Sequence, residues 1–96
     1  MSLKDKKRVH VFIFGNVQGV YFRSYTQMEG QKRKVAGWVR NCPDGSVEAI
    51  VEGEPAAVDD MVEWFKTGPP TAQVAKIEAS EERPMGETGV FNIRFH

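Results

Sequence analysis

The sequence predicts an α+β fold in which two helices cover one face of an antiparallel sheet of four to five strands. Segments rich in β-branched and aromatic residues occur before, between and after two segments of helical periodicity, and turn-forming residues separate them. The length of 96 residues suits a single domain. Hydrophobic residues make up 41% of the chain and charged residues 27%, close to the average of folded globular proteins. We therefore expect one folded, soluble domain.

The first half of the chain predicts a strand, a helix and a hairpin. Residues 8–15 carry apolar side chains in both alternating sets, which is typical of a central strand covered on both faces. Large apolar side chains recur at a spacing of three within residues 22–34 and indicate a helix, with Gly30 as its weak point. Residues 35–41 and 46–52 have strand-like composition and predict two strands. The Cys-Pro-Asp-Gly segment between them has the composition of a tight turn, so the two strands should form a hairpin.

The second half predicts a helix followed by two strands. Pro55 suits the first turn of a helix, and apolar residues follow at helical spacing until Gly-Pro-Pro at residues 68–70 ends it. Residues 75–80 and 91–95 alternate between apolar and polar side chains, as expected of strands with one solvated face. Residues 84–89 form the loop between these strands.

The order strand, helix, strand, strand, helix, strand, with a short last strand added, is that of the split βαβ or ferredoxin-like sandwich. We expect a flexible N-terminal tail over residues 1–7 and one domain over residues 8–96. One core should contain the apolar residues Ile13, Val58, Met61, Val62, Phe65 and Ile77. Because this fold supports many unrelated functions, the function has to be inferred from particular residues.

Charge and cysteine content restrict the partners and the location of the protein. The 13 basic residues balance 13 acidic residues, so no long-range positive field draws the chain to nucleic acid or to an anionic membrane. The single cysteine, Cys42, cannot form an internal disulfide, and the lysine-rich start lacks the apolar stretch of a signal peptide. We expect a cytoplasmic protein with no nucleic acid and no membrane partner, and a solvated charge run at residues 4–8.

Residues 15–23 form the first candidate site. They leave the first predicted strand, turn and enter a helix, and Gly15 and Gly19 permit close backbone approach and positive φ angles. Successive amide N–H groups in such a turn can form an anion-binding nest at the helix N-terminus. Arg23 could bind two oxygens of a phosphate group with its planar guanidinium. On spacing alone, the alternative is a glycine-bearing connection with an exposed arginine.

Asn41 is the second candidate site residue. It ends a predicted strand beside a turn, and its amide offers a donor and an acceptor to a water molecule or a ligand. Taken alone, an asparagine in this position is also explained as a turn former. Neighbouring side chains of a strand point to opposite faces, so Arg40 and Cys42 should face away from a site that Asn41 faces. We interpret His10 as a partly buried packing residue.

Two segments together resemble the signatures of the acylphosphatase family. Residues 15–23 read Gly-x-Val-Gln-Gly-Val-x-Phe-Arg, and residues 37–47 read Gly-Trp-Val-Arg-Asn-x-x-x-Gly-x-Val. The spacing between them, the chain length and the Phe-Asn-Ile-Arg-Phe ending are also similar to that family. The resemblance implies a ferredoxin-like α/β sandwich in which Asn41 positions a hydrolytic water. It also implies that phosphate is held by Arg23 and by the loop residues Asn16, Val17, Gln18, Gly19, Val20, Tyr21 and Phe22.

The implied reaction is the hydrolysis of an acyl phosphate, a carboxylic-phosphoric mixed anhydride, to a carboxylate and inorganic phosphate. The leaving carboxylate has a pKa of about 4 to 5, so no strong general acid is required. Positioning and electrostatic stabilisation then do most of the catalysis. We expect no cofactor, no metal ion, and a monomer whose partner is a small-molecule acyl phosphate.

Two binding functions remain as alternatives. RNA-recognition domains share this topology, and residues 11–17 resemble their aromatic first-strand motif, but their second motif is missing and the net charge is zero. A regulatory or carrier-processing domain is the other alternative, because acylphosphatase-like domains also occur within larger proteins.

Overall fold

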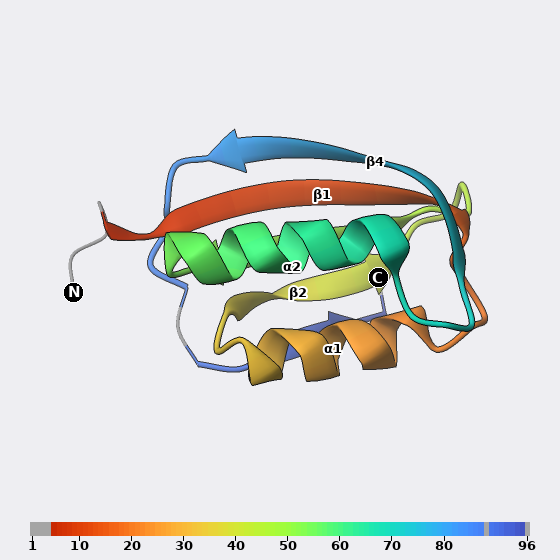
Figure 1. Ribbon diagram of the computed structural model, residues 1–96, viewed down its shortest axis with the longest axis horizontal. Helices are drawn as coiled ribbons and strands as arrows, with labels where there is room; N and C mark the ends of the chain where they lie inside the picture. Colours follow the sequence, from red (N-terminus) through yellow and green to blue (C-terminus); the bar gives the residue numbers. More distant parts are fainter. Residues whose placement is uncertain (1–4, 88, 96) are drawn as a thin grey trace.

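The computed structural model describes residues 5–87 and 89–95 (Figure 1). Its elements, in chain order, are β1 (Lys7–Asn16), α1 (Phe22–Lys32), β2 (Ala36–Asn41), β3 (Val47–Gly53), α2 (Pro55–Thr67), β4 (Gln73–Glu82) and β5 (Phe91–Arg94). The strands form one sheet in the order β4-β1-β3-β2-β5. Both helices lie against the same face of this sheet (Figure 1). The predicted ferredoxin-like fold is therefore confirmed.

The strand directions differ from the prediction in one respect. β1 pairs antiparallel with β3 and β4, and β2 pairs antiparallel with β3, but β5 pairs parallel with β2. The expected antiparallel sheet is therefore mixed. The reason is that β4 ends at Glu82 and β5 begins at Phe91, so the connection over residues 83–90 is too short to return along the length of the sheet. As a result β5 starts at the same end of the sheet as β2 and runs in the same direction.

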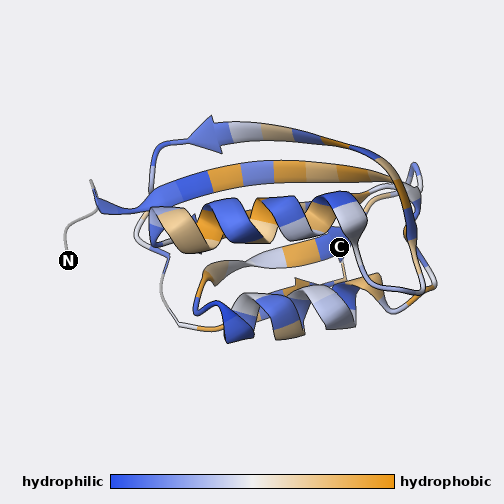
Figure 2. Cartoon of the chain, in the orientation of Figure 1, coloured by the Kyte–Doolittle hydropathy of each residue, from blue (hydrophilic) through white to orange (hydrophobic). Residues whose placement is uncertain are grey.

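The core lies between the helices and the sheet. Val9, Val11 and Ile13 of β1 face the helices and are buried. Figure 2 shows how hydropathy changes along β1: its first residues are hydrophilic, and its later residues are mostly hydrophobic. The expected core is confirmed, since its members are either fully buried or packed against buried residues: Ile13, Val58, Met61 and Phe65 in the first group, and Val62 and Ile77 in the second.

The opposite side of the sheet, here called the open face, carries no helix among the described residues. The expectation that both faces of β1 are covered is therefore wrong. Phe12 and Phe14 lie on the open face and are half-buried. The ring centroid of His10 lies 4.8 Å from that of Phe12, and Lys76 Nζ lies 5.1 Å from the ring centroid of Phe14. Neighbouring polar side chains thus cover these rings in part, so the apolar residues on this side require no second layer.

The helix α1 ends at Lys32 rather than at residue 34, because Lys34 adopts a left-handed conformation with φ of 58°. The N–H of Val35 then donates to the carbonyl oxygen of Gly30 at 3.1 Å and closes the helix. Gly30 is required by packing: a Cβ there would lie 2.7 Å from the ring of Phe91. The glycine that looks like a weak point in the sequence is where α1 packs closely on β5.

An ion-pair network around the buried Arg8 side chain joins the start of β1 to the loop before β5. Arg8 is only 6% exposed. Its guanidinium contacts three carboxylates, those of Glu52 at 3.0 Å, Glu82 at 3.1 Å and Glu87 at 3.3 Å. The expectation of a solvated charge run is therefore wrong at Arg8, because strand pairing places this side chain among carboxylates of β3, β4 and the following loop.

The expected flexible tail covers residues 1–7, of which residues 1–4 lie outside the described residues. Lys7 is the first residue of β1, and its Nζ lies 2.7 Å from Asp59 Oδ1 on α2. Strand β1 thus includes a residue that we assigned to the tail.

Glu52 is the most buried carboxylate of the Arg8 network, with an exposure of 1%. It also accepts hydrogen bonds from the backbone N–H groups of Met85 at 3.0 Å, Gly86 at 2.8 Å and Glu87 at 3.0 Å. Burial by itself raises the pKa of a carboxyl group, but these hydrogen bonds and the one from Arg8 outweigh it and lower the pKa of Glu52. This stabilisation of the native state is fully present above the unfolded-state pKa of about 4.3 and is lost as the pH falls through the lower native-state pKa.

We predict that Glu52→Gln lowers the free energy of unfolding by about 3 kcal/mol at pH 7, because it leaves Arg8 buried with less compensation. Urea titrations of the variant and the wild type measure this difference, which should shrink as the pH falls below about 4. Glu78→Gln is the control, since Glu78 is exposed and its loss should cost less than about 1 kcal/mol. Equal losses in the two variants would contradict the prediction.

Candidate active site

Strand pairing brings the end of β1 and the end of β2 together. Both strands flank β3 and run antiparallel to it, so they run in the same direction. Val47 of β3 pairs with Ile13 of β1 on one side and with Asn41 of β2 on the other. The loop that leaves β1 and the side chain of Asn41 therefore lie at the same end of the sheet.

The loop from β1 to α1 turns within a few residues. The register between β1 and β4 shifts between Phe14 and Gly15, which bends the end of β1. Gly19 adopts φ of 73°, a conformation that favours glycine, and Tyr21 precedes α1 in a left-handed conformation with φ of 61° and ψ of 24°. The turn directs the N-terminus of α1 toward the end of the sheet that carries Asn41.

The first turn of α1 can bind an anion. No side chain in the described part of the protein caps this end of the helix. The N–H groups of Phe22, Arg23 and Ser24 therefore have no partner within the helix. The first turn also contains no acidic residue, so nothing in it offsets the positive end of the helix dipole. This combination favours a phosphate group or another anion.

Arg23 occupies the second position of α1 and is half-buried. Its guanidinium carbon lies 4.9 Å from the ring centroid of Phe95. Arg8, Arg33 and Arg40 all bind carboxylates. In contrast, no carboxylate of residues 5–87 and 89–95 forms an ion pair with Arg23, so its positive charge is available to a bound anion.

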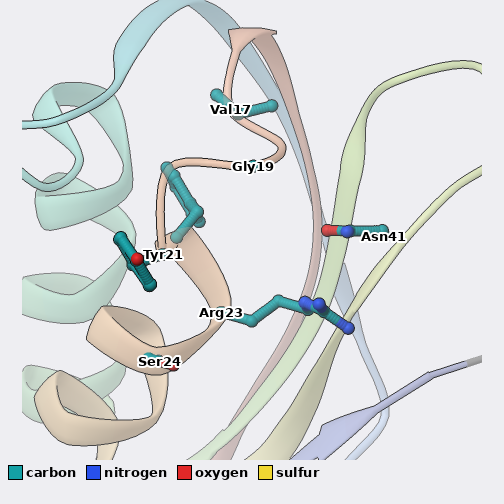
Figure 3. A pocket seen from close by; sticks show the side chains of 7 residues that line it. Val17, Gly19, Tyr21, Arg23, Ser24 and Asn41 are labelled. Carbon is teal, nitrogen blue, oxygen red and sulfur yellow. The ribbon is translucent and has the colours of Figure 1, made fainter.

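Arg23 and Asn41 line the same hollow, which has a volume of about 290 Å³. Figure 3 shows the Arg23 side chain extending from α1 toward β2, where Asn41 lies. The loop closes the hollow on the side of β1. The lining residues are Val17, Gly19, Tyr21, Phe22, Arg23, Ser24 and Asn41.

Asn41 is the last residue of β2 and shares the helix-facing side of that strand with the buried Val39. Arg40 lies on the open face, where its Nε is 2.6 Å from Glu48 Oε1. Cys42 Sγ lies 3.9 Å from the same carboxylate oxygen. The prediction that Arg40 and Cys42 face away from the site is therefore confirmed.

The structure brings four of the seven predicted loop residues to the hollow, namely Val17, Gly19, Tyr21 and Phe22. Asn16, Gln18 and Val20 are outside this lining. Asn16 remains in β1, where it pairs with Gln73 of β4. Val20 packs against the core, and its carbonyl oxygen accepts a hydrogen bond of 2.6 Å from the hydroxyl of Thr71. Contacts between phosphate and the backbone amides of the loop stay a prediction.

Three features of the site were missed by the sequence reasoning. Ser24 lines the hollow, and a helix starting at residue 22 already placed it in the first turn. Phe95 lies beside the Arg23 guanidinium, and no sequence signal indicates that contact. The side chain of Gln18 donates to the backbone carbonyl oxygens of Cys42 and Ser46. A signature that contains Gln18 does not reveal where its side chain points.

His10 is more than a packing residue. Besides contacting the ring of Phe12, its Nε2 lies 2.6 Å from Glu48 Oε2 and its Nδ1 lies 3.4 Å from Glu82 Oε2. These groups lie on the open face, and the sheet separates them from the hollow. His10 and Cys42 are therefore both placed away from the candidate site.

Within residues 5–87 and 89–95, no group of three or more His, Cys, Asp and Glu side chains could hold a metal ion. In the same residues, no helix is long and apolar enough to cross a membrane.

The fold and the hollow define a small ferredoxin-like domain with a site suited to a phosphoryl group. The family model for acylphosphatase matches residues 9–93. The chain is 47% identical over 93 residues to the acylphosphatase of Rubrobacter xylanophilus, covering 97% of this chain and 84% of that protein. It is 52% identical over 81 residues to the acylphosphatase of Gloeobacter violaceus, covering 84% and 87%. This chain therefore belongs to the acylphosphatase family.

Solved structures agree with this assignment. The crystal structure of acylphosphatase from Bacillus subtilis is similar with a TM-score of 0.88 and 40% identity, covering 93% of this chain and 99% of that chain. Full-length HypF in its phosphate- and nucleotide-bound form is similar with a TM-score of 0.79 and 27% identity, but the match covers only 12% of that chain. The chain thus matches the acylphosphatases over most of their length, whereas the similarity to HypF is confined to one part of a longer protein.

We predict that inorganic phosphate binds in the hollow, because the amides of the first helical turn and Arg23 converge there without a competing carboxylate. Addition of phosphate, followed by amide NMR, should shift the signals of residues 17–24. Arg23→Ala should remove most of this response, whereas Arg40→Ala should preserve it. Shifts centred instead on Trp38 and Arg94, which line a separate hollow on the open face, would show that the anion site is misplaced.

Proposed function

We propose that this member of the acylphosphatase family hydrolyses acyl phosphates in the hollow between α1 and β2. In this proposal the amides of residues 16–22 and Arg23 hold the phosphoryl group, and Asn41 positions the attacking water. The observation that carries the proposal is that Arg23 and Asn41, which lie far apart in the sequence, line one hollow. Family membership supports the reaction, and the geometry of the hollow supports the residue roles.

The reaction needs few protein groups. The oxygen of water attacks phosphorus, and the bond between phosphorus and the bridging oxygen breaks. The products are a carboxylate and inorganic phosphate. Because the leaving carboxylate is a weak base with a conjugate-acid pKa of about 4 to 5, no protein group has to protonate it. The main obstacles are the negative charge of the phosphoryl group and the alignment of water opposite the leaving oxygen.

Arg23 and the start of α1 address the first obstacle. The guanidinium presents parallel N–H donors that match two phosphoryl oxygens. The uncapped N–H groups of the first helical turn and the positive end of the helix dipole add further stabilisation. Because these groups are held by the sheet and the helix before substrate binds, little reorganisation is required during the reaction.

Asn41 addresses the second obstacle. Its amide carbonyl can accept a hydrogen bond from water, and its amide N–H₂ can donate to a phosphoryl oxygen. Its position at the end of β2, paired with Val47, gives it a fixed backbone. The imidazole of His10 lies on the open face, with its Nε2 2.6 Å from Glu48 Oε2, and so is not placed to act as a base in the hollow. We infer that a phosphoryl oxygen accepts the proton of the attacking water.

The size of the hollow and the balanced charge of the chain bear on the substrate and the partners. A hollow of about 290 Å³ is at the small end of the usual range for ligand sites and suits a small molecule. The balanced charge of the chain gives no reason to expect nucleic acid or a membrane surface as a partner. We propose that the protein acts as a monomer in the cytoplasm.

We predict that Arg23→Lys lowers kcat/KM for benzoyl phosphate by about a hundredfold, because a point charge cannot reproduce the bidentate contact. Arg40→Lys is the matched control and should change kcat/KM by less than about twofold, since Arg40 lies on the open face. Steady-state hydrolysis of benzoyl phosphate measures both variants. Similar losses in the two would refute the assignment of Arg23, and a wild-type protein without activity would refute the proposed function.

We predict that Asn41→Ala lowers kcat by at least about a hundredfold while inorganic phosphate still binds and inhibits, as expected when one transition-state contact is removed. The alternative role of Asn41 as a turn former is disfavoured by the turn itself. The hydrogen bond from Cys42 N to Ser46 O at 2.8 Å closes it without the Asn41 side chain. Measurements of kcat, phosphate inhibition and Tm on one preparation separate the two roles, because a turn former would lose about 1 kcal/mol of stability and keep its turnover.

A further inference from the structure

The side chain of Gln18 joins the two halves of the candidate site. Its Nε2 donates hydrogen bonds to the backbone carbonyl oxygens of Cys42 and Ser46, each at 2.8 Å. These residues are at the two ends of the turn that follows Asn41. We propose that Gln18 is a positioning residue, which fixes Asn41 and its water relative to the phosphoryl group held by the loop and Arg23. This inference rests on the proposed function.

The chemistry of the contact fits this role. A primary amide has two N–H donors, and the turn presents two carbonyl acceptors at equal distance. Both carbonyls already accept hydrogen bonds within the turn, that of Cys42 from Gly45 N at 3.1 Å and that of Ser46 from Cys42 N at 2.8 Å. Gln18 therefore uses the second acceptor position of each oxygen. The turn closes without Gln18, so these contacts connect the turn to the loop and are not needed to form it.

A rigid turn over residues 42–46 would restrict the position of the neighbouring Asn41. Asp44 Oδ1 accepts hydrogen bonds from the hydroxyl of Ser46 at 2.6 Å and from its backbone N–H at 2.9 Å. These two contacts lower the pKa of Asp44, and the hydrogen bond from the Ser46 hydroxyl contributes more than the one from the backbone. Hydrogen bonds within the turn hold both of its ends. The contacts of Gln18 with this turn therefore also restrict Asn41, which directly precedes it.

Gln18 is the direct link from the loop to this turn. Among the described residues of the loop, no other side chain of residues 17–21 donates to or accepts from the turn over residues 42–46. A second hydrogen bond of the loop joins Val20 to Thr71, on the side of β4. Without Gln18, the backbone pairing of β1, β3 and β2 and the packing of Val17 in the core still relate the loop to Asn41, but no side-chain hydrogen bond of the described residues 17–21 holds the turn directly. Small shifts of a reacting group can cost large factors in rate.

A residue that acts through Asn41 should affect turnover more than phosphate binding. Gln18→Met keeps the length of the side chain but removes both donors. We expect it to lower kcat by about tenfold, which is less than the roughly hundredfold cost of misplacing a reacting group by about 1 Å. The inhibition constant of inorganic phosphate should change by less than about twofold. Gln18→Ala is measured in the same way and decides the outcome if the methionine variant does not fold.

The decisive experiment is a double-mutant cycle with Asn41→Ala, using benzoyl phosphate hydrolysis and inhibition by inorganic phosphate. If Gln18 acts through Asn41, adding Gln18→Met to Asn41→Ala should lower kcat by less than about twofold further. The same loss in both backgrounds, or a rise in the phosphate inhibition constant as large as the fall in kcat, would overturn the inference. A failure of Asn41→Ala to lower kcat would instead refute the proposed role of Asn41.

Gln27→Met provides the matched control. Gln27 also uses its Nε2 to donate to a backbone carbonyl, that of Phe91 at 2.9 Å, and is also partly buried. The contact joins α1 to β5 and does not reach the turn after Asn41. Gln27→Met should lower Tm about as much as Gln18→Met but change kcat by less than about twofold. An equal fall of kcat in the two variants would attribute the effect to lost stability and would overturn the positioning role.

Discussion

The site depends on one constraint, the pairing of β3 between β1 and β2. This pairing makes β1 and β2 parallel to each other, so both end at the same place, one in the loop that leads into α1 and the other in Asn41. The register is as important as the order of the strands. A slip of β2 by one residue would turn Asn41 to the open face and place Arg40 or Cys42 toward the hollow. The chemistry proposed for the hollow therefore requires this register.

The charges of the protein are arranged so that the anion site has no internal competitor. On the open face, burial raises the pKa of Glu48, but hydrogen bonds with His10 and Arg40 outweigh it and lower that pKa. Arg8 and Arg33 also form ion pairs with carboxylates, those of Glu52 and Glu29. Arg23 is on the other side of the sheet and contacts an aromatic ring instead. A chain with zero net charge can therefore offer a localised positive site, because the carboxylates near the other arginines are paired with them, and none in residues 5–87 and 89–95 pairs with Arg23.

Errors in the prediction have identifiable physical causes. The periodicity of β5 was visible, but its direction depends on which end of the sheet residues 83–90 reach, and periodicity contains no such information. Apolar residues on both sides of β1 suggested two covered faces, although adjacent polar side chains cover Phe12 and Phe14 in part. Arg8 looked like part of a solvated run, because its partner Glu52 is distant in the sequence.

The sequence by itself determined the order of the elements, the fold class, the family resemblance, and Arg23 and Asn41 as candidates, because these depend on local periodicity and on residues at fixed spacing. Only the tertiary structure decided which side chains meet. Gln18 reaches the turn after Asn41, Phe95 reaches Arg23, and Glu52 accepts from the loop before β5. Each of these contacts joins segments whose separation in space is set by strand pairing and helix packing. Such distances are properties of the folded chain and have no counterpart in residue spacing.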